Sequence, residues 1–226
     1  GVAGLISIIE ASNQHQQVAS ANWHASASFI ANEQTDGIFI DIGSSTTDII
    51  PFQSGKLCNR GFSDQERMRS DELLYTGIVR TPMMAVVSKV PFAGEWQSIA
   101  AEHFASMSDV YRITGELDES HDLMPAADNG EKQISDSVRR VARMLGRDAE
   151  DFSQLGHYKD LARYVAEEQE NKISQALQRV ISDNPALAHA TLIGAGTGRF
   201  LVAKLATRHG LEYVDVERLL DAEKGQ

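Results

Sequence analysis

The apolar positions of the chain are arranged most regularly near its front. Two runs rich in β-branched residues, Ile38–Ile42 and Ile49–Phe52, flank the polar pentapeptide Gly43-Ser-Ser-Thr-Thr47. Such runs, separated by a short polar stretch, are typical of two strands joined by a tight turn. The pattern therefore predicts a hairpin with one carboxylate at the end of the first strand, Asp41, and one at the start of the second, Asp48.

Longer apolar repeats predict helices. Residues 17–32 carry small and apolar side chains at helical spacing. Residues 135–145 are typical of a capped amphipathic helix that Gly146 ends. A longer helix is expected from about Tyr158 to Ser182, with one apolar and one charged face.

The remaining segments complete an α/β pattern. Near the C-terminus a short strand at residues 191–193, a helix at 200–209 and a strand at 213–214 follow one another. Pro82–Val90 is apolar and extended enough for a core strand, and the polar run 61–71 is expected to leave the sheet surface. The acidic stretch 116–128 contains His121, and a solvated loop is favoured there over a metal site.

Composition narrows the class of protein. The chain has 226 residues, 42% hydrophobic residues and a net charge of -11, which is ordinary for a soluble domain and argues against nucleic acid as a partner. No apolar run has the roughly 18 residues of a membrane span. Cys58 is single, so a reducing cytoplasm is the expected location. The oligomeric state stays open, with a homodimer among the alternatives.

The predicted turn carries the candidate chemistry. Backbone amides and hydroxyls of Gly43, Ser44, Ser45, Thr46 and Thr47 suit a phosphoryl oxygen. The two flanking carboxylates, Asp41 and Asp48, suit a hydrogen bond from the turn, or Mg²⁺ held through water, because this ion prefers carboxylate oxygens. The alternative is a Ser/Thr-rich turn whose hydroxyls bond only their own backbone.

Two further glycine segments add candidates. In Tyr75–Pro82, Gly77 is expected to allow an unusual backbone angle, and Arg80 to contact diphosphate. A surface arginine at a strand end is the alternative for Arg80.

The second segment lies between the expected strand at 191–193 and the helix at 200–209. Gly194, Gly196 and Gly198 form a glycine turn before that helix, which suits a nucleotide or substrate. The dinucleotide fingerprint fails because Arg199 stands where a small residue is needed. An S-adenosylmethionine fold is rejected because too few residues remain after the turn.

The octapeptide Asp41-Ile-Gly-Ser-Ser-Thr-Thr-Asp48 resembles the second phosphate motif of the superfamily that contains acetate and sugar kinases, Hsp70 and actin. It is most similar to the hydantoinase/oxoprolinase branch. Four further segments, residues 19–23, 71–82, 109–112 and 194–200, resemble proteins linked to methanopterin-dependent one-carbon metabolism, whose methanogen members are furan-methanamine synthases of methanofuran biosynthesis.

This resemblance implies a fold and a domain plan. The expected fold is an RNase H-like, actin-like lobe with a mixed five-stranded sheet. Residues 1–34 would be a remnant of a first lobe and an interlobe helix, and 35–226 the second lobe, with a helical insertion at about 126–185. The first phosphate motif of the superfamily is missing before Asp41. The chain is therefore expected to be a fragment, or a protein whose front end has been replaced.

The resemblance also implies an activity. The expected enzyme is a transferase that joins an aminomethylfuran-methyl diphosphate to a tyramine-type phenol and releases diphosphate. The turn and Arg80 would stabilise the leaving group, Asp41 and Asp48 would organise Mg²⁺ or the turn, and the base stays unnamed. The alternatives are an ATP-dependent kinase or oxoprolinase-type amide hydrolase, and a non-catalytic lobe.

Overall fold

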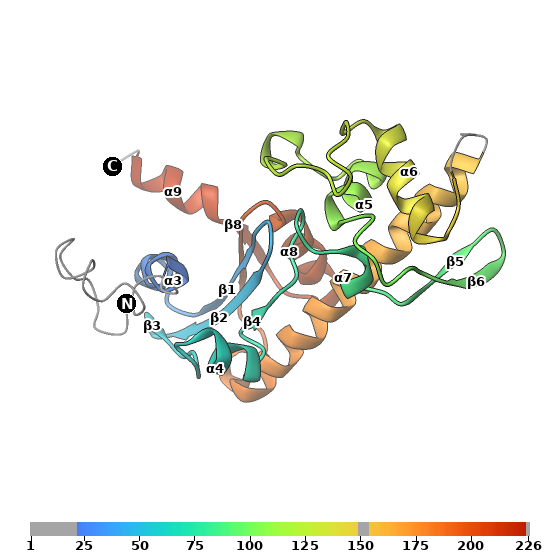
Figure 1. Ribbon diagram of the computed structural model, residues 1–226. Helices are drawn as coiled ribbons and strands as arrows, with labels where there is room; N and C mark the ends of the chain where they lie inside the picture. The colour runs from blue at the N-terminus through green and yellow to red at the C-terminus, as the bar shows by residue number, and fades with distance from the viewer. Residues whose placement is uncertain (1–21, 149–153, 225–226) are drawn as a thin grey trace. The chain divides into compact units, whose positions relative to one another are not determined.

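The computed structural model describes residues 22–148 and 154–224 (Figure 1). It confirms an α/β protein with a mixed sheet. The described residues form two compact units. Unit 1 contains those up to Asp41, Thr47–Leu74 and those from Ser174 on, whereas unit 2 contains Ile42–Thr46 and Tyr75–Ile173.

Unit 1 is built on one sheet. Its strands follow the spatial order β3-β2-β1-β7-β8, and β4 pairs with β2 outside this path. β1 is parallel to β7, which is parallel to β8, whereas β3 and β4 are antiparallel to β2. The strands are β1 (Gly37–Ile42), β2 (Thr47–Gln53), β3 (Lys56–Leu57), β4 (Leu73–Leu74), β7 (Leu192–Ala195) and β8 (Tyr213–Asp215).

The predicted hairpin is confirmed in β1 and β2. These neighbouring strands are joined by four residues, a link too short for a parallel crossover, so they run antiparallel. Within each strand, successive side chains point to opposite faces of the sheet. Phe39 and Phe52 pack with helix α3 (Asn22–Glu33) on one face.

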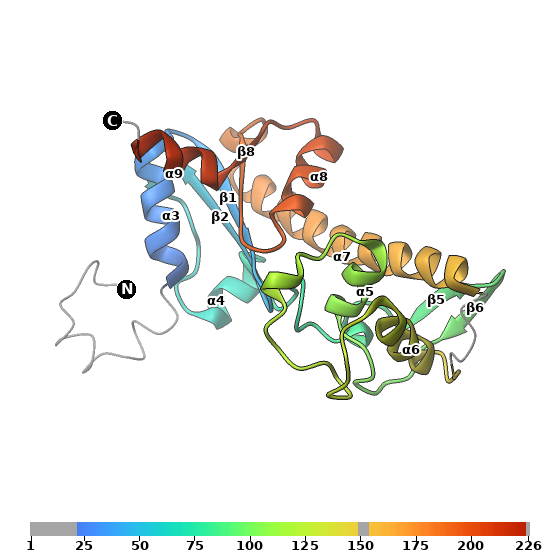
Figure 2. The same cartoon turned by 90° about the horizontal axis from the view of Figure 1, so that it is seen from above.

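Helices cover both faces of this sheet. Figure 2 shows α3 and α9 (Val216–Lys224) on one side of β1 and β2, and α8 (Arg199–His209) on the other. Trp23 and Ile30 of α3 share a buried cluster with the strands, and Leu219 of α9 packs against it. The expected glycine turn and helix near the C-terminus are confirmed as the link from β7 to α8.

The polar run 61–71 does not leave the sheet surface. It forms helix α4 (Asp64–Arg69), which starts at a capping box made by Ser63 and Glu66. The helix buries Arg67, whose side chain is 1% exposed. The prediction was wrong because a run of charged residues is typical of an exposed segment, whereas in the fold Arg67 of this run is buried and paired with Asp48.

Most of the regular elements of unit 2 are helices. Its elements are η1 (Met83–Ala85), β5 (Lys89–Phe92), β6 (Glu95–Ser98), α5 (Met107–Thr114), η2 (Glu119–His121), α6 (Ile134–Met144) and the part of α7 (Leu155–Asp183) up to Ile173. β5 and β6 form a separate antiparallel pair (Figure 1). The short helix η4 (Pro185–Leu187) follows α7 in unit 1.

The predicted helices at 135–145 and 158–182 are confirmed as α6 and α7, and Gly146 takes a positive φ of 68° after α6. Residues 17–21 of the first predicted helix lie outside the described residues. The expected core strand at Pro82–Val90 is wrong. The chain there first forms η1, and the strand that follows belongs to the β5–β6 pair.

The acidic stretch 116–128 is held by buried charge, not solvated throughout. Asp122 is 3% exposed and accepts hydrogen bonds from Arg112 at 2.5 Å, while Lys132 lies 3.2 Å from its other oxygen. In α6, the fully buried Arg140 donates to Asp128 of the stretch at 3.1 Å and to Asp109 of α5 at 2.8 Å. Ion pairs therefore hold the stretch to both helices.

None of the helices in the described ranges combines the length and apolar character that a bilayer crossing requires.

Candidate functional site

Two acidic side chains lie where β1 ends and β2 begins. Burial and the neighbouring Asp48 carboxylate raise the pKa of Asp41 to about 6. Burial also raises the pKa of Asp48, although the guanidinium of Arg67 opposes this shift. The hairpin therefore brings two partly buried carboxylates close enough to repel each other.

Arg67 is a residue of this site that the sequence did not reveal. Its Nη2 donates to Asp48 Oδ1 at 2.7 Å and to the carbonyl of Glu72 at 3.1 Å. The guanidinium also lies 4.0 Å from the ring centre of Trp23. Arg67 thus fixes the Asp48 side chain and leaves its second oxygen, Oδ2, outside this hydrogen bond.

The predicted glycine turn adjoins Asp41 within unit 1. Asp41 is in register with Ala195 of the parallel strand β7, so it stands beside the start of the Gly196–Gly198 turn. Gly196 has a positive φ of 78°, which favours glycine, and Gly198 caps α8. Gly194 serves packing, because a Cβ there would lie 2.7 Å from the Tyr213 ring.

The Ser-Ser-Thr turn leaves backbone donors uncommitted. The Gly43 amide donates to the Thr46 carbonyl at 2.9 Å and closes the turn. No described residue accepts a hydrogen bond from the amides of Ser44, Ser45 or Thr46. These three residues are half-buried, whereas Thr47 is fully buried at the start of β2. Among the described residues, these three amides therefore have no hydrogen-bond acceptor.

The turn is held through its carbonyl groups by the Gly77–Arg80 segment. The Gly43 carbonyl accepts from Ile78 at 3.0 Å, and the Ser44 carbonyl accepts from Val79 at 3.0 Å and Arg80 at 2.8 Å. All of these residues belong to unit 2. Because the carbonyls face this segment, the bonds fix the turn without using its amides.

Gly77 has a different role from the one predicted. Its φ is not positive, so this position does not need the unusual backbone angle that glycine allows. A Cβ at this position would instead lie 2.5 Å from the Ser45 nitrogen and 2.7 Å from the Gly43 carbonyl oxygen. Glycine is needed because the two backbones touch.

A buried polar network supports this contact from α5 and α7. Gln169 donates to Thr76 Oγ1 at 2.7 Å and to the Gly77 carbonyl at 3.0 Å, and accepts from the Tyr111 hydroxyl at 2.6 Å. The Gly77 amide donates to Thr81 Oγ1 at 2.8 Å. The segment before Arg80 is therefore tied to helices by satisfied hydrogen bonds.

The Arg80 side chain is exposed, and among the described residues it has no ion-pair partner. It lines a pocket of about 220 Å³ within unit 2. The other residues that line it are Val79, His103, Ser106, Ser108, Asp122, Met124, Pro125 and Ala127. Val79 and Arg80 thus bond the Gly43–Thr47 turn and also line this pocket.

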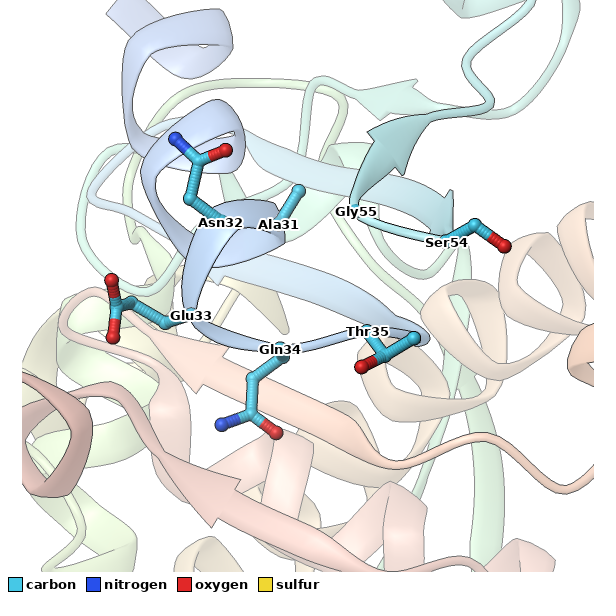
Figure 3. Close-up of a pocket in the computed structure, with 7 residues that line it drawn as sticks. All are labelled: Ala31, Asn32, Glu33, Gln34, Thr35, Ser54 and Gly55. Atoms are coloured by element: carbon cyan, nitrogen blue, oxygen red, sulfur yellow. The ribbon is translucent and has the colours of Figure 1, made fainter.

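A second pocket, of about 330 Å³, lies in unit 1 where β1 begins, at the end of the strand opposite Asp41 (Figure 3). It is lined by the end of α3, the following loop and the Ser54–Gly55 turn. In Figure 3 the side chains of Asn32, Glu33 and Gln34 point in different directions. This pocket therefore lacks converging polar groups.

Asp41 and Asp48 are the side chains of this site that could hold a divalent ion, provided that the ion brings further ligands with it. The described residues contain no group of three or more His, Cys, Asp or Glu that could hold a metal alone. Mg²⁺, however, is usually held by one or two carboxylates together with substrate phosphates and water. Burial and the repulsion from Asp48 both disfavour the ionised form of Asp41, and a cation between the two carboxylates would offset these effects.

Known proteins similar to this chain were compared with it. The hydantoinase/oxoprolinase family matches residues 3–221. A (4-{4-[2-(gamma-L-glutamylamino)ethyl]phenoxymethyl}furan-2-yl)methanamine synthase of Methanocaldococcus jannaschii is 31% identical over 142 residues, 62% of this chain and 43% of that protein. The synthase of the same name from Methanococcus vannielii is 30% identical over 128 residues, 56% of this chain and 57% of that protein.

The chain spans about half the length of these curated relatives. The family match covers nearly all of its residues, including the hairpin, the Gly77–Arg80 segment and the glycine turn before α8. The chain therefore belongs to the hydantoinase/oxoprolinase family.

Proposed function

We propose that this chain is part of a cofactor-biosynthesis enzyme that forms an aryl ether and releases diphosphate. The two similar synthases are named for a product in which a phenoxymethyl group joins a phenol oxygen to a furan. Making that bond from a furanylmethyl diphosphate and a tyramine-type phenol requires the departing diphosphate to be stabilised. The proposed pathway is the biosynthesis of methanofuran-type cofactors, in the cytoplasm.

The observation that carries the proposal is the run of three uncommitted amides at Ser44, Ser45 and Thr46. Backbone N–H groups fixed before the reaction stabilise negative charge that develops on a leaving group, because they need no reorganisation. The free guanidinium of Arg80, whose own amide bonds the turn, would add a charge-assisted contact.

Asp41 and Asp48 would hold Mg²⁺, directly or through water. The bound ion would supply positive charge beside the diphosphate. The role of the protein residues is to keep both carboxylates in place, which Arg67 does for Asp48 through its 2.7 Å hydrogen bond.

The strand order supports an RNase H-like, actin-like lobe for unit 1. The order β3-β2-β1-β7-β8, with β2 antiparallel to its neighbours and β1, β7 and β8 parallel, agrees with this proposal. In open α/β sheets ligands bind beyond the carboxyl ends of the parallel strands. Asp41 and the Gly196–Gly198 turn lie at that edge, where Gly196 and Gly198 would contact substrate or nucleotide.

Calorimetry on the 226-residue chain tests this proposal. Mg-diphosphate is expected to bind, and Arg80→Ala should weaken binding about 10- to 100-fold, the size of one charge-assisted hydrogen bond. Asp48→Asn, which keeps an oxygen for Arg67, should also weaken it. Arg163→Ala is the control, since Arg163 is an exposed arginine that pairs with the exposed Asp160.

Tight binding of Mg-ATP in place of Mg-diphosphate would contradict the transferase and favour the ATP-dependent alternative. Binding of neither ligand would favour a non-catalytic lobe. Far-UV circular dichroism of each variant shows whether a loss of binding reflects unfolding.

A further inference from the structure

The pocket of about 220 Å³ in unit 2 has a polar wall with positive charge. Arg80 and His103 line it, together with Ser106 and Ser108, whose hydroxyl oxygens lie 2.9 Å apart. These two serines are 8% and 7% exposed, so their hydroxyl pair is buried. One hydroxyl hydrogen is used between them, which leaves the other hydroxyl able to donate to a ligand.

The acidic group of the pocket is neutralised by cations behind it. Asp122 is contacted by Arg112 and by Lys132, and Arg112 also binds Glu119. Among the described residues that line the pocket, the titratable groups are Arg80, His103 and Asp122. Since Asp122 is committed to two cations, the imidazole of His103 is the group of this set that can take a proton from a ligand.

The apolar residues that line the pocket come mainly from the loop that follows Asp122. Met124, Pro125 and Ala127 line the pocket, and Val79 adds a further apolar side chain. Pockets for drug-sized ligands hold roughly 300–1,000 Å³, so this smaller pocket suits a ligand with a single ring. A pocket lined by both apolar side chains and hydrogen-bonding groups fits an aromatic ring that carries a hydroxyl group.

We propose that this pocket binds the phenolic acceptor and that His103 accepts the proton of the phenol, an inference that rests on the proposed function. The ring lies against Met124 and Pro125, and its oxygen faces His103.

The reaction step balances without a further reagent. The phenol O–H bond breaks, and its proton passes to a ring nitrogen of His103. The phenol oxygen forms a bond with the methylene carbon of the furan while the bond from that carbon to the diphosphate oxygen breaks. Diphosphate leaves with the electron pair, and imidazolium later returns the proton to water.

Binding tests the pocket without turnover. N-acetyltyramine and N-acetylphenethylamine differ only in the phenolic hydroxyl, and calorimetry on the 226-residue chain should show the first binding about tenfold more tightly. His103→Ala should remove this preference, because the acceptor of the phenolic hydrogen is lost. The control is His189→Ala, which alters an exposed histidine in unit 1 and should keep the preference.

Turnover separates this inference from the proposed function. With a furanylmethyl diphosphate and a tyramine derivative, His103→Ala should lower kcat by about 10²- to 10⁴-fold. Equal affinities of the parent chain for the two probes, or an unchanged preference for N-acetyltyramine in His103→Ala, would overturn the inference. If binding depends on the hydroxyl group and on His103 but the protein forms no ether, the acceptor pocket is supported and the proposed transferase activity is rejected.

Discussion

Arg67 and Asp48 form an ion pair of 2.7 Å in which the arginine side chain is 1% exposed and the aspartate 16%. Loss of one partner from such a pair leaves a buried charge without compensation. We expect Arg67→Met to lower the free energy of unfolding by about 3–5 kcal/mol at pH 7. Urea denaturation measures the change.

The double variant Asp48→Asn/Arg67→Met separates the pair from the packing around it. It should be more stable than Arg67→Met, because no unpaired carboxylate remains. Arg163→Met, which alters an exposed arginine paired with Asp160, should leave the unfolding midpoint unchanged. If Arg67→Met were equally harmless, the ion pair would have no structural role.

Gly77→Ala should destabilise the chain by about 1–3 kcal/mol, because the added methyl group meets backbone atoms that cannot rotate away. The same substitution should weaken Mg-diphosphate binding by displacing the Ser44–Ser45 peptide. Thermal unfolding and calorimetry measure the two effects. Gly156→Ala in α7 is the matched control, since a Cβ there meets nothing within 4 Å and alanine favours a helix.

Asp41→Asn should stabilise the chain at neutral pH but not in acid. The folded-state pKa of Asp41 is raised to about 6, from a value of 3.8. The ionised Asp41 carboxylate therefore lowers the free energy of unfolding. This effect is absent below about pH 4, grows as the pH rises, and is complete above about pH 6. Without added metal, the variant should gain about 1–3 kcal/mol over the parent at pH 7.5 and lose this advantage near pH 4.

Urea denaturation of both proteins at several pH values gives this difference directly. Asp160→Asn, in an exposed ion pair, should show no comparable gain at pH 7.5. A parent and an Asp41→Asn variant with parallel stability curves from pH 4 to 7.5 would contradict the raised pKa.

Gln169→Leu should cost on the order of 2–3 kcal/mol, because Thr76 and the Gly77 carbonyl lose donors inside the protein. Gln175→Leu on the same helix alters an exposed side chain and should be near neutral. Hydrogen exchange should also accelerate at the amides of Val79 and Arg80, which bond the turn. Unchanged exchange at these amides would show that the network does not support the turn.

The hairpin could be predicted because its information is local. β-Branched runs around Gly43–Thr47 specify two strands and a turn, and α6 and α7 follow from their periodic apolar faces. Gly146 marked the end of α6 correctly for the same reason. What these segments need from the rest of the chain is only a core to pack against.

Tertiary contacts determined what the sequence did not reveal. Arg67 lies in a charged run that resembles a surface helix, and its burial depends on Trp23 and Asp48, both distant in sequence. Gly77 was correctly singled out, but its reason, contact with the Ser45 backbone, needs coordinates. The pocket with His103 was also missed, because its lining residues are spread from Val79 to Ala127.

The place of β1 inside its sheet has a consequence for biosynthesis. One neighbour of β1 in the sheet is β7, with Ile38 in register with Leu192. Because β7 lies far along the chain, it is translated long after the hairpin has left the ribosome. Until then one edge of β1 is an open template for another chain. Nascent chains stalled before β7 should therefore recruit chaperones and aggregate more readily than the finished protein.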